Sequence, residues 1–191
     1  TPNVIVLPQS KRKEYINKAD CILIGNGMDV NEKTKKAVAD VLKTKKKCII
    51  DAASLRVLPA KLLHSKVILT PHTLEFKSAF GIPATEKNVR FASKRYNCTI
   101  LLKGKTDIIA SEGKVVKVKG GNAGMTKGGT GDVLAGLLCA LYSRCDSPLS
   151  AAYTASYLNK KAGERLYKRL KFNFSSEDLA GELAYAAAEL Q

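Results

Sequence analysis

The chain has 191 residues and an apolar content of 45%, enough to bury the core of one domain. No apolar run approaches the roughly 20 residues of a bilayer-spanning helix, and the N-terminus lacks the pattern of a secretion signal, so we expect a cytoplasmic protein and no membrane protein. The net charge of +15 would suit a nucleic-acid-binding module, but the basic residues are scattered and aromatic residues make up only 6%, which disfavours a base-stacking surface.

Short apolar runs alternate with amphipathic segments along the chain. The apolar runs predict strands over residues 3–7, 21–25, 47–51, 66–70 and 98–104. The intervening segments predict helices over residues 10–19, 31–43, 73–80 and 86–96. Next come two apolar runs joined by Glu-Gly, which predict an antiparallel hairpin over residues 107–111 and 114–119. The chain ends with three predicted helices over residues 132–143, 149–169 and 176–190.

Alternation of strands and helices predicts an α/β fold. Right-handed crossovers then give a mainly parallel sheet with helices on both faces. The sequence shows no internal repeat, low-complexity segment or linker, so we expect residues 1–191 to form a single domain.

The five cysteines form no CxxC pair, which favours reduced thiols in a cytosolic compartment over disulfides or a metal site. Three of them stand inside apolar runs, where cysteine is typical of a small core residue. We therefore assign no catalytic role to any cysteine.

A glycine-rich stretch precedes the last three helices and ends in “GGTGD”, residues 128–132. Glycines let main-chain N–H groups converge on an anion, and a helix start adds free N–H donors and a positive dipole end. A carboxylate would repel a phosphate, so Asp132 is better suited to take a proton from a hydroxyl group beside the bound phosphoryl group. The alternative is an ordinary glycine turn in which Thr130 or Asp132 caps the helix.

Other predicted strands also end in polar residues. In “ILTPHTLEF” Pro71 stops a strand, which places His72 at the carboxyl edge of the sheet, where open α/β folds bind ligands. The alternative for His72 is a surface histidine. In “LLKGKTDIIAS” the turn at Lys103 can bring a cation to a nucleotide phosphate, but it fits a plain hairpin turn equally well. Because “ILIGNGMD” and “IIDAASL” end strands in a similar way, the pattern predicts one ligand-binding edge.

These motifs resemble, in sequence and in order, those of a known family. The motifs are “GNGMD”, “IIDAASL”, “ILTPHTLEF”, “ILLKGKTDIIA” and “GNAGMTKGGTGDVLAG”. The chain is similar over nearly its whole length to the ADP/ATP-dependent NAD(P)H-hydrate dehydratases, which occur alone or fused behind an epimerase domain. The resemblance implies a ribokinase-like, three-layer αβα fold with a mainly parallel central sheet, an antiparallel hairpin and C-terminal helices. “TPHTLEF” separates this family from vitamin kinases of the same fold, which tend to have asparagine after Thr-Pro.

The resemblance also implies an activity and a set of site residues. Members of the family are hydro-lyases that phosphorylate the C6 hydroxyl of the hydrated (S)-form of NADH or NADPH and then eliminate phosphate. The reaction is a metabolite repair, because it restores a damaged cofactor. By position, Asp132 is the base, and the anion hole comprises Gly129, Thr130 and Gly131. The implied contacts of the hydrated dinucleotide are Asp29, His72 and Asp132. The implied contacts of ADP or ATP are Lys103, Gly104, Lys105, Thr106, Asp107 and Gly131.

The implied ligands are small molecules: NADHX or NADPHX, with ADP or ATP as co-substrate. Mg²⁺ is expected to arrive with the nucleotide, bridging phosphates and retaining waters, so no residue is assigned as a metal ligand. The resemblance further implies a homo-oligomer and a fused or associated epimerase domain, and nucleic acid is not an expected partner.

Several positions depart from the family pattern. Asn26 stands where proline is usual, and Asp29 stands where a third glycine is usual. An added carboxylate near phosphates is unfavourable by Coulomb repulsion, which counts against the contact implied for Asp29. Ala53 replaces a common second aspartate, so no catalytic role is assigned to Asp51.

The family's domain usually begins upstream of the first motif found here. We therefore expect the chain to lack the N-terminal segment of its domain and to be the C-terminal part of a longer polypeptide. Two alternative functions stay open from the residues alone. One is a ribokinase-like kinase of a vitamin precursor, and the other is a basic nucleic-acid-binding or nucleotide-sensing module.

Overall fold

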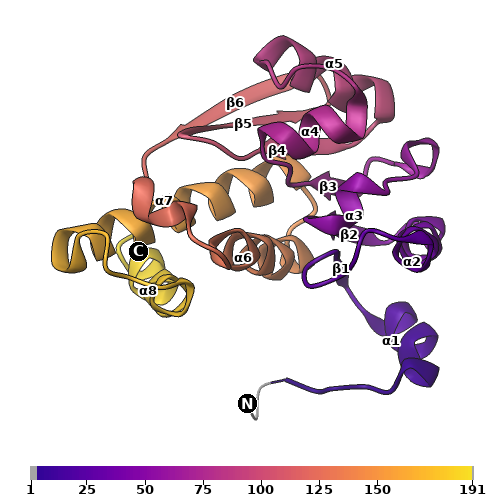
Figure 1. Ribbon diagram of the computed structural model, residues 1–191, viewed down its shortest axis with the longest axis horizontal. Coiled ribbons are helices and arrows are strands. Elements are labelled where there is room, and N and C mark those ends of the chain that lie inside the picture. The colour runs from indigo at the N-terminus through magenta and orange to yellow at the C-terminus, as the bar shows by residue number, and fades with distance from the viewer. Residues whose placement is uncertain (1–3, 191) are drawn as a thin grey trace.

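A computed structural model describes residues 4–190 of the chain and shows a β-sheet between two layers of helices (Figure 1). The strands are β1 (Cys21–Ile24), β2 (Lys47–Ile50), β3 (Val67–Leu69), β4 (Thr99–Leu102), β5 (Thr106–Ser111) and β6 (Lys114–Lys119). The α-helices are α1 (Arg12–Lys18), α2 (Glu32–Lys43), α3 (Ala53–Arg56), α4 (Thr73–Phe80), α5 (Glu86–Tyr96), α6 (Thr130–Arg144), α7 (Pro148–Leu170) and α8 (Ser176–Ala188). Short 3₁₀ segments are η1 (Gln9–Lys11), η2 (Ala60–Leu62) and η3 (Ala123–Thr126).

The six-stranded sheet has the order β1-β2-β3-β4-β5-β6. Strands β1 to β4 are parallel, whereas β5 pairs antiparallel with both β4 and β6. Glu112 and Gly113 join β5 to β6 with φ angles of 51° and 81°, the two left-handed residues that a two-residue hairpin turn requires. The predicted mainly parallel sheet with an antiparallel hairpin is therefore confirmed.

Alternating side chains of the central strands build a core on each face of the sheet. In β2, Cys48 and Ile50 pack against α2 to α5, whereas Ile49 points to the opposite face and packs with α6 and α7. In β4, Ile100 and Leu101 divide between the two faces in the same way. All five side chains are buried, which explains why these strands read as continuous apolar runs.

The predicted strand at residues 3–7 is wrong over residues 4–7, and residue 3 lies outside the described residues. Val4, Ile5 and Val6 are 65%, 76% and 89% exposed. A strand needs a hydrogen-bonded neighbour, and in residues 4–190 the sheet ends at β1 without pairing to this segment. An apolar run in the sequence reveals β-propensity but not whether a partner strand is present.

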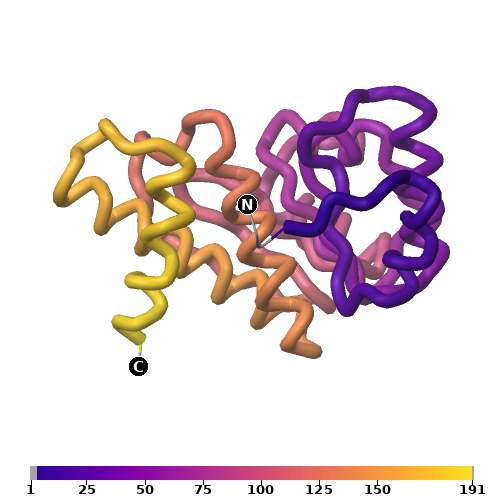
Figure 2. Tube along the Cα trace, turned by 90° about the horizontal axis from the view of Figure 1, so that it is seen from below, coloured from indigo at the N-terminus to yellow at the C-terminus, as the bar shows by residue number. Residues whose placement is uncertain are grey.

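Helix α8 packs on α7 and α6 beyond the edge of the sheet, and it lies at the opposite end of the molecule from α1 and α2 (Figure 2). Its start is fixed by a capping box, in which Ser175 accepts from the Asp178 N–H and Asp178 accepts from the Ser175 N–H. None of the helices within residues 4–190 combines the length and the apolar character of a bilayer crossing.

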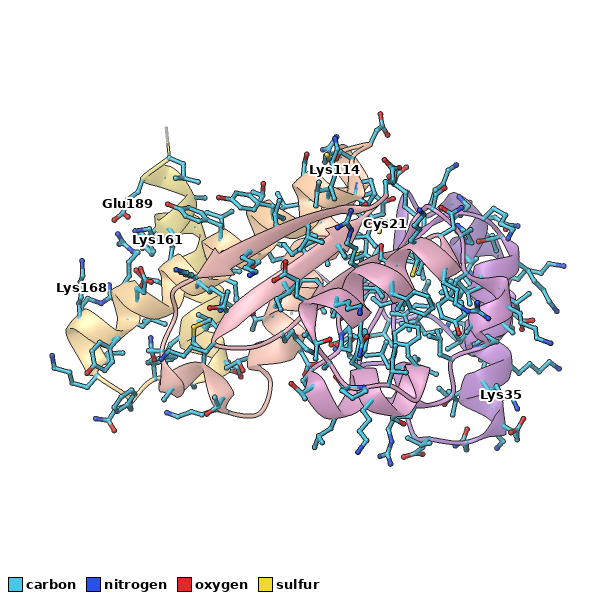
Figure 3. The ribbon with its side chains drawn as sticks, turned by 90° about the horizontal axis from the view of Figure 1, so that it is seen from above. Cys21, Lys35, Lys114, Lys161, Lys168 and Glu189 are labelled. Carbon is cyan, nitrogen blue, oxygen red and sulfur yellow. The ribbon has the colours of Figure 1, made fainter. Side chains whose placement is uncertain are left out.

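Basic side chains lie at both ends of the molecule. Lys161 and Lys168 project near α8, and Lys35 projects from α2 on the far side (Figure 3). Dispersal of this kind is typical of a solvated surface and not of a single nucleic-acid-binding face.

The interpretation of cysteines as small core residues holds for Cys48 and Cys98. Burial raises the pKa of each thiol to about 12 and keeps both thiols neutral.

Candidate active site

The carboxyl ends of β1, β2, β3 and β4 lie along one edge of the sheet because these strands are parallel. The loops that follow them carry Asn26, Asp51, His72 and Lys103. Hydrogen bonds continue the ladder into the loops: the Asp51 N–H donates to the Ile24 carbonyl at 3.1 Å, and His72 and Lys103 form an isolated parallel bridge. The sheet thus brings the four polar residues side by side.

Gly25 lets the loop after β1 pass against the end of β2. Its φ is 125°, and a Cβ atom placed there would lie 1.8 Å from the Asp51 carbonyl oxygen. Only glycine fits both constraints. The close approach places Asn26 beside Asp51, and Asn26 Nδ2 donates to Asp51 Oδ2 at 3.0 Å.

Asp51 is the most deeply buried carboxylate of this edge. Its side chain is 2% exposed, and its Oδ1 accepts from Lys103 Nζ and from Thr70 Oγ1, each at 2.8 Å. A buried charge is tolerated only when it is paired and hydrogen-bonded, as here. Asp51 therefore orients Lys103, although sequence reasoning assigned Asp51 no catalytic role.

His72 is the N-cap of α4. Its Nδ1 accepts from the main-chain N–H groups of Leu74 and Glu75, and Glu75 Oε2 accepts from the His72 N–H at 2.8 Å. Glu75 Oε2 also lies 3.9 Å from Lys103 Nζ. The His72 side chain is half exposed, so it caps the helix from the surface and leaves part of its ring open to a ligand. The contact implied for the hydrated dinucleotide stays a prediction.

The glycine stretch ends in the first turn of α6. Gly129 is the N-cap with a φ of 85° and makes no side-chain hydrogen bond, so the alternative in which Thr130 or Asp132 caps the helix is wrong. The Thr130 hydroxyl lies 2.6 Å and 2.8 Å from the carbonyl oxygens of Met125 and Lys127, which fixes the loop in front of the helix. Among the first N–H groups of α6, that of Thr130 donates to the Lys127 carbonyl at 3.4 Å, whereas those of Gly131 and Asp132 have no acceptor within the described residues and remain available to an anion.

Asp132 joins α6 to the network at the sheet edge. Its exposed side chain lies on the first turn of the helix, and its Oδ1 accepts from Asn26 Nδ2. Lys103 Nζ also reaches this turn, because it lies 3.6 Å from the position of a Cβ on Gly131. The structure thereby brings Asp132, Lys103 and His72 to one edge, together with the helix N-terminus.

The loop between β4 and β5 is held from inside the protein. Asp107 is 4% exposed, and its carboxylate accepts from the Gly104 N–H at 2.8 Å and from Ser156 Oγ at 2.7 Å. Lys160 Nζ lies 3.3 Å from Asp107 Oδ1 and donates to the carbonyl oxygens of Gly104 and Lys105. The Asp107 side chain therefore shapes the turn from within, while Gly104 and Lys105 are exposed. The nucleotide contacts implied for residues 103–107 stay predictions.

Four polar residues of this region were missed by sequence reasoning: Asn26, Thr70, Ser156 and Lys160. Ser156 and Lys160 lie on the buried face of α7. A lysine that is only 7% exposed, as Lys160 is, needs a partner for its charge inside the protein. Asp29, by contrast, is exposed in the loop before α2. Its implied contact with the dinucleotide stays a prediction.

The chain is similar to known proteins over most of its length. Residues 1–184 match a family described as NAD(P)H-hydrate dehydratase. The chain is 35% identical to the ADP-dependent (S)-NAD(P)H-hydrate dehydratase of Nitrosopumilus maritimus, covering 96% of this chain and 71% of that protein. It is also 35% identical to the bifunctional NAD(P)H-hydrate repair enzyme Nnr of Archaeoglobus fulgidus, covering 87% of this chain but only 34% of that protein.

A solved structure is similar as well. The ADP/ATP-dependent NAD(P)H-hydrate dehydratase of Bacillus subtilis, crystallised with ATP and Mg²⁺, superposes with a TM-score of 0.82. Its sequence is 28% identical, and the match covers 90% of this chain and 65% of that one. A ribokinase-like superfamily protein of Enterococcus faecalis superposes with a TM-score of 0.86 at 25% identity, covering 98% of this chain and 70% of that one, so the ribokinase-like fold is confirmed. The matched family does not support a nucleic-acid-binding module.

Proposed function

Because the chain belongs to the NAD(P)H-hydrate dehydratase family, we propose that it restores hydrated NADH or NADPH in a reaction that consumes ADP or ATP. The observation that carries the proposal is the position of Asp132. Its carboxylate stands on the turn that offers free N–H groups, and Lys103 reaches the same turn. Base, anion hole and cation are the three parts that phosphoryl transfer to a hydroxyl group requires.

In the first step, Asp132 takes the proton of the C6 hydroxyl while that oxygen attacks the terminal phosphorus of the nucleotide. The bond between that phosphorus and its bridging oxygen breaks, and the shortened nucleotide leaves. The free N–H groups at the start of α6 stabilise the negative charge of the migrating phosphoryl group. Gly129, with its left-handed φ of 85°, is the N-cap that turns the loop into this helix start.

In the second step, the C6–O bond breaks and phosphate departs with its electron pair. The departing phosphate then accepts a proton from the neighbouring ring carbon, and the electron pair of that C–H bond restores the double bond of the dihydropyridine ring. Phosphate is a much better leaving group than hydroxide, which is why the reaction consumes a nucleotide. The same N–H groups hold the departing phosphate, and the Lys103 ammonium, which also pairs with Asp51 Oδ1 at 2.8 Å, can donate a further hydrogen bond to it.

The nucleotide is expected to bring Mg²⁺ with it. Among residues 4–190, no three His, Cys, Asp or Glu side chains come together as a metal cage. We expect Mg²⁺ to be held through phosphate oxygens and retained waters, which is how the ion commonly binds beside nucleotides. When bound, the ion neutralises phosphate charge, and the residues of the chain orient the groups around it.

The test is recovery of the dihydronicotinamide absorbance after hydrated NADH or NADPH is mixed with enzyme, Mg²⁺ and ADP or ATP. We expect recovery and release of one phosphate per ring restored. If the absorbance does not return and a stable phosphorylated alcohol accumulates from a vitamin precursor, the protein is a kinase of the same fold and the proposal fails.

Three further expectations accompany this function. The protein is proposed to act in the cytoplasm, to form a homo-oligomer, and to work with an epimerase domain that is fused or associated. Support for the last comes from the bifunctional relative, of whose length the chain covers about a third. Light scattering tests the oligomer, and sequencing of the full gene tests the fusion.

A further inference from the structure

Asn26 uses both hydrogens of its side-chain amide on carboxylates. Nδ2 donates to Asp51 Oδ2 at 3.0 Å and also to Asp132 Oδ1. Its own oxygen, Oδ1, is buried and accepts no hydrogen bond from the residues that the structure describes. Buried polar atoms without a partner are rare. Asn26 therefore leaves its Oδ1 without a hydrogen bond while its Nδ2 makes two.

The chemistry of the two partners fixes the orientation of this amide. A rotated amide would place Oδ1 against the Asp51 and Asp132 carboxylates, and three acceptors would then face one another. Asp51 is additionally held by Lys103, so its position does not depend on Asn26 alone. Asp132 is exposed, and Asn26 is its only side-chain hydrogen-bond donor among the described residues.

The main chain around Asn26 forms a tight turn. The Met28 N–H donates to the Gly25 carbonyl at 3.2 Å, and Gly27 has a φ of 69°. This is the pattern of a type II turn, in which the second position accepts proline and the third requires glycine. Proline, which is usual at position 26 in the similar family, would keep the turn but would carry no side-chain donor. The two hydrogen bonds are therefore a property of Asn26 and not of the turn.

We propose that Asn26 is a positioning residue that holds the Asp132 carboxylate for proton transfer, and this inference rests on the proposed function. By holding Asp132 Oδ1, it leaves Oδ2 free to face the hydroxyl group of the substrate. The Asn26 NH₂ group donates one hydrogen to each carboxylate, so Asp132 and Asp51 share a donor and their oxygens need not contact each other directly. The base is thus tied through Asp51 to Lys103, the cation beside the anion hole.

Three variants separate the donor from the packing and the turn. Asn26→Leu keeps the approximate size and shape but loses the donor without adding a charge, Asn26→Ala removes the side chain, and Asn26→Pro restores the residue usual in the family. We expect kcat to fall about 10- to 100-fold in all three, as for loss of alignment of a catalytic group. The KM values for nucleotide and hydrated dinucleotide should change by less than about threefold, because the bound substrates keep their own contacts.

A measurement without turnover keeps this inference separate from the proposed function. In a spectrum of the side-chain amide groups of the ¹⁵N-labelled protein, both Asn26 Nδ2 protons should show the shifts of hydrogen-bonded donors. Asp132→Ala should move one of them toward the position of a free amide, whereas Asp40→Ala, at an exposed carboxylate elsewhere, should move neither. If Asp132→Ala moves neither proton, or if Asn26→Pro keeps the kcat of the unmutated enzyme, Asn26 is not a positioning residue.

Discussion

Lys103 Nζ lies 2.8 Å from Asp51 Oδ1 across the ends of β4 and β2, and the Asp51 side chain is 2% exposed. The pair joins two loops that are 52 residues apart in the chain. Buried pairs of this kind add little net stability relative to apolar residues, but loss of one partner leaves an uncompensated charge. Lys103 consequently stabilises the fold by pairing with Asp51, in addition to its proposed role of binding phosphate.

Replacing Lys103 by Met should lower the free energy of unfolding by about 3 kcal/mol, because the Asp51 carboxylate would lose its cation. Urea denaturation measures the change. Lys105→Met, at an exposed neighbour in the same loop, should stay within about 0.5 kcal/mol of the unmutated protein. The double variant Lys103→Met with Asp51→Asn should regain part of the loss. Equal stability of the two single lysine variants would show that the ion pair is not structural.

Asp132→Ala should reduce turnover by about 10²- to 10⁴-fold, because the variant loses its general base. The side chain is exposed, so thermal stability should change little. Calorimetry should find the affinity for ADP unchanged or raised, since a negative charge near the phosphates is gone. Asp40→Ala, at an exposed pair with Arg12, is the matched control and should keep full activity. Retained turnover in Asp132→Ala would rule out the proposed mechanism.

Much of the fold and part of the site followed from the sequence. Buried parallel strands appear as continuous apolar runs, and their carboxyl ends must share one edge, which is why His72 and Lys103 could be grouped in advance. The partners of Asp51 could not be predicted, because Asn26 and Lys103 reach it from loops 25 and 52 residues away. Distances between loops depend on how the whole sheet is assembled.

The same limit explains why the strand predicted over residues 3–7 is wrong over residues 4–7. Its apolar residues have high β-propensity, yet pairing requires a neighbour at the right distance, and propensity contains no such information. It also explains the start of α6. The sequence placed the start at Asp132, but Gly129 is the N-cap and the helix begins at Thr130, because loop contacts made by the Thr130 hydroxyl decide where it starts.

Gly129→Ala should destabilise the protein and weaken phosphate binding together. The residue has a φ of 85°, and an added Cβ would lie 2.6 Å from Ser176 Oγ on α8. Strain in the left-handed region costs about 1 to 3 kcal/mol, and relief of the contact would move the anion hole. Gly128→Ala is the matched control, because no described atom lies within 4 Å of its Cβ position and its φ is not positive. The urea midpoint and the KM for ADP measure both effects; equal values for the two variants would contradict the assigned geometry.

Protonation of His64 should lower the free energy of unfolding in mild acid relative to neutral pH. Burial lowers the pKa of His64 below its usual 6.5, and the nearby Lys45 lowers it further, while a hydrogen bond to the Leu42 carbonyl partly opposes the shift. The unfolded chain therefore binds a proton that the folded chain does not, so the stability present above about pH 6.5 is lost as the pH falls toward the folded pKa. His64→Gln should flatten that part of the stability curve when urea midpoints are measured from about pH 8 to about pH 5. A titration of the His64 ring proton by NMR gives the folded pKa directly, and a value above 6.5 would reverse the predicted slope.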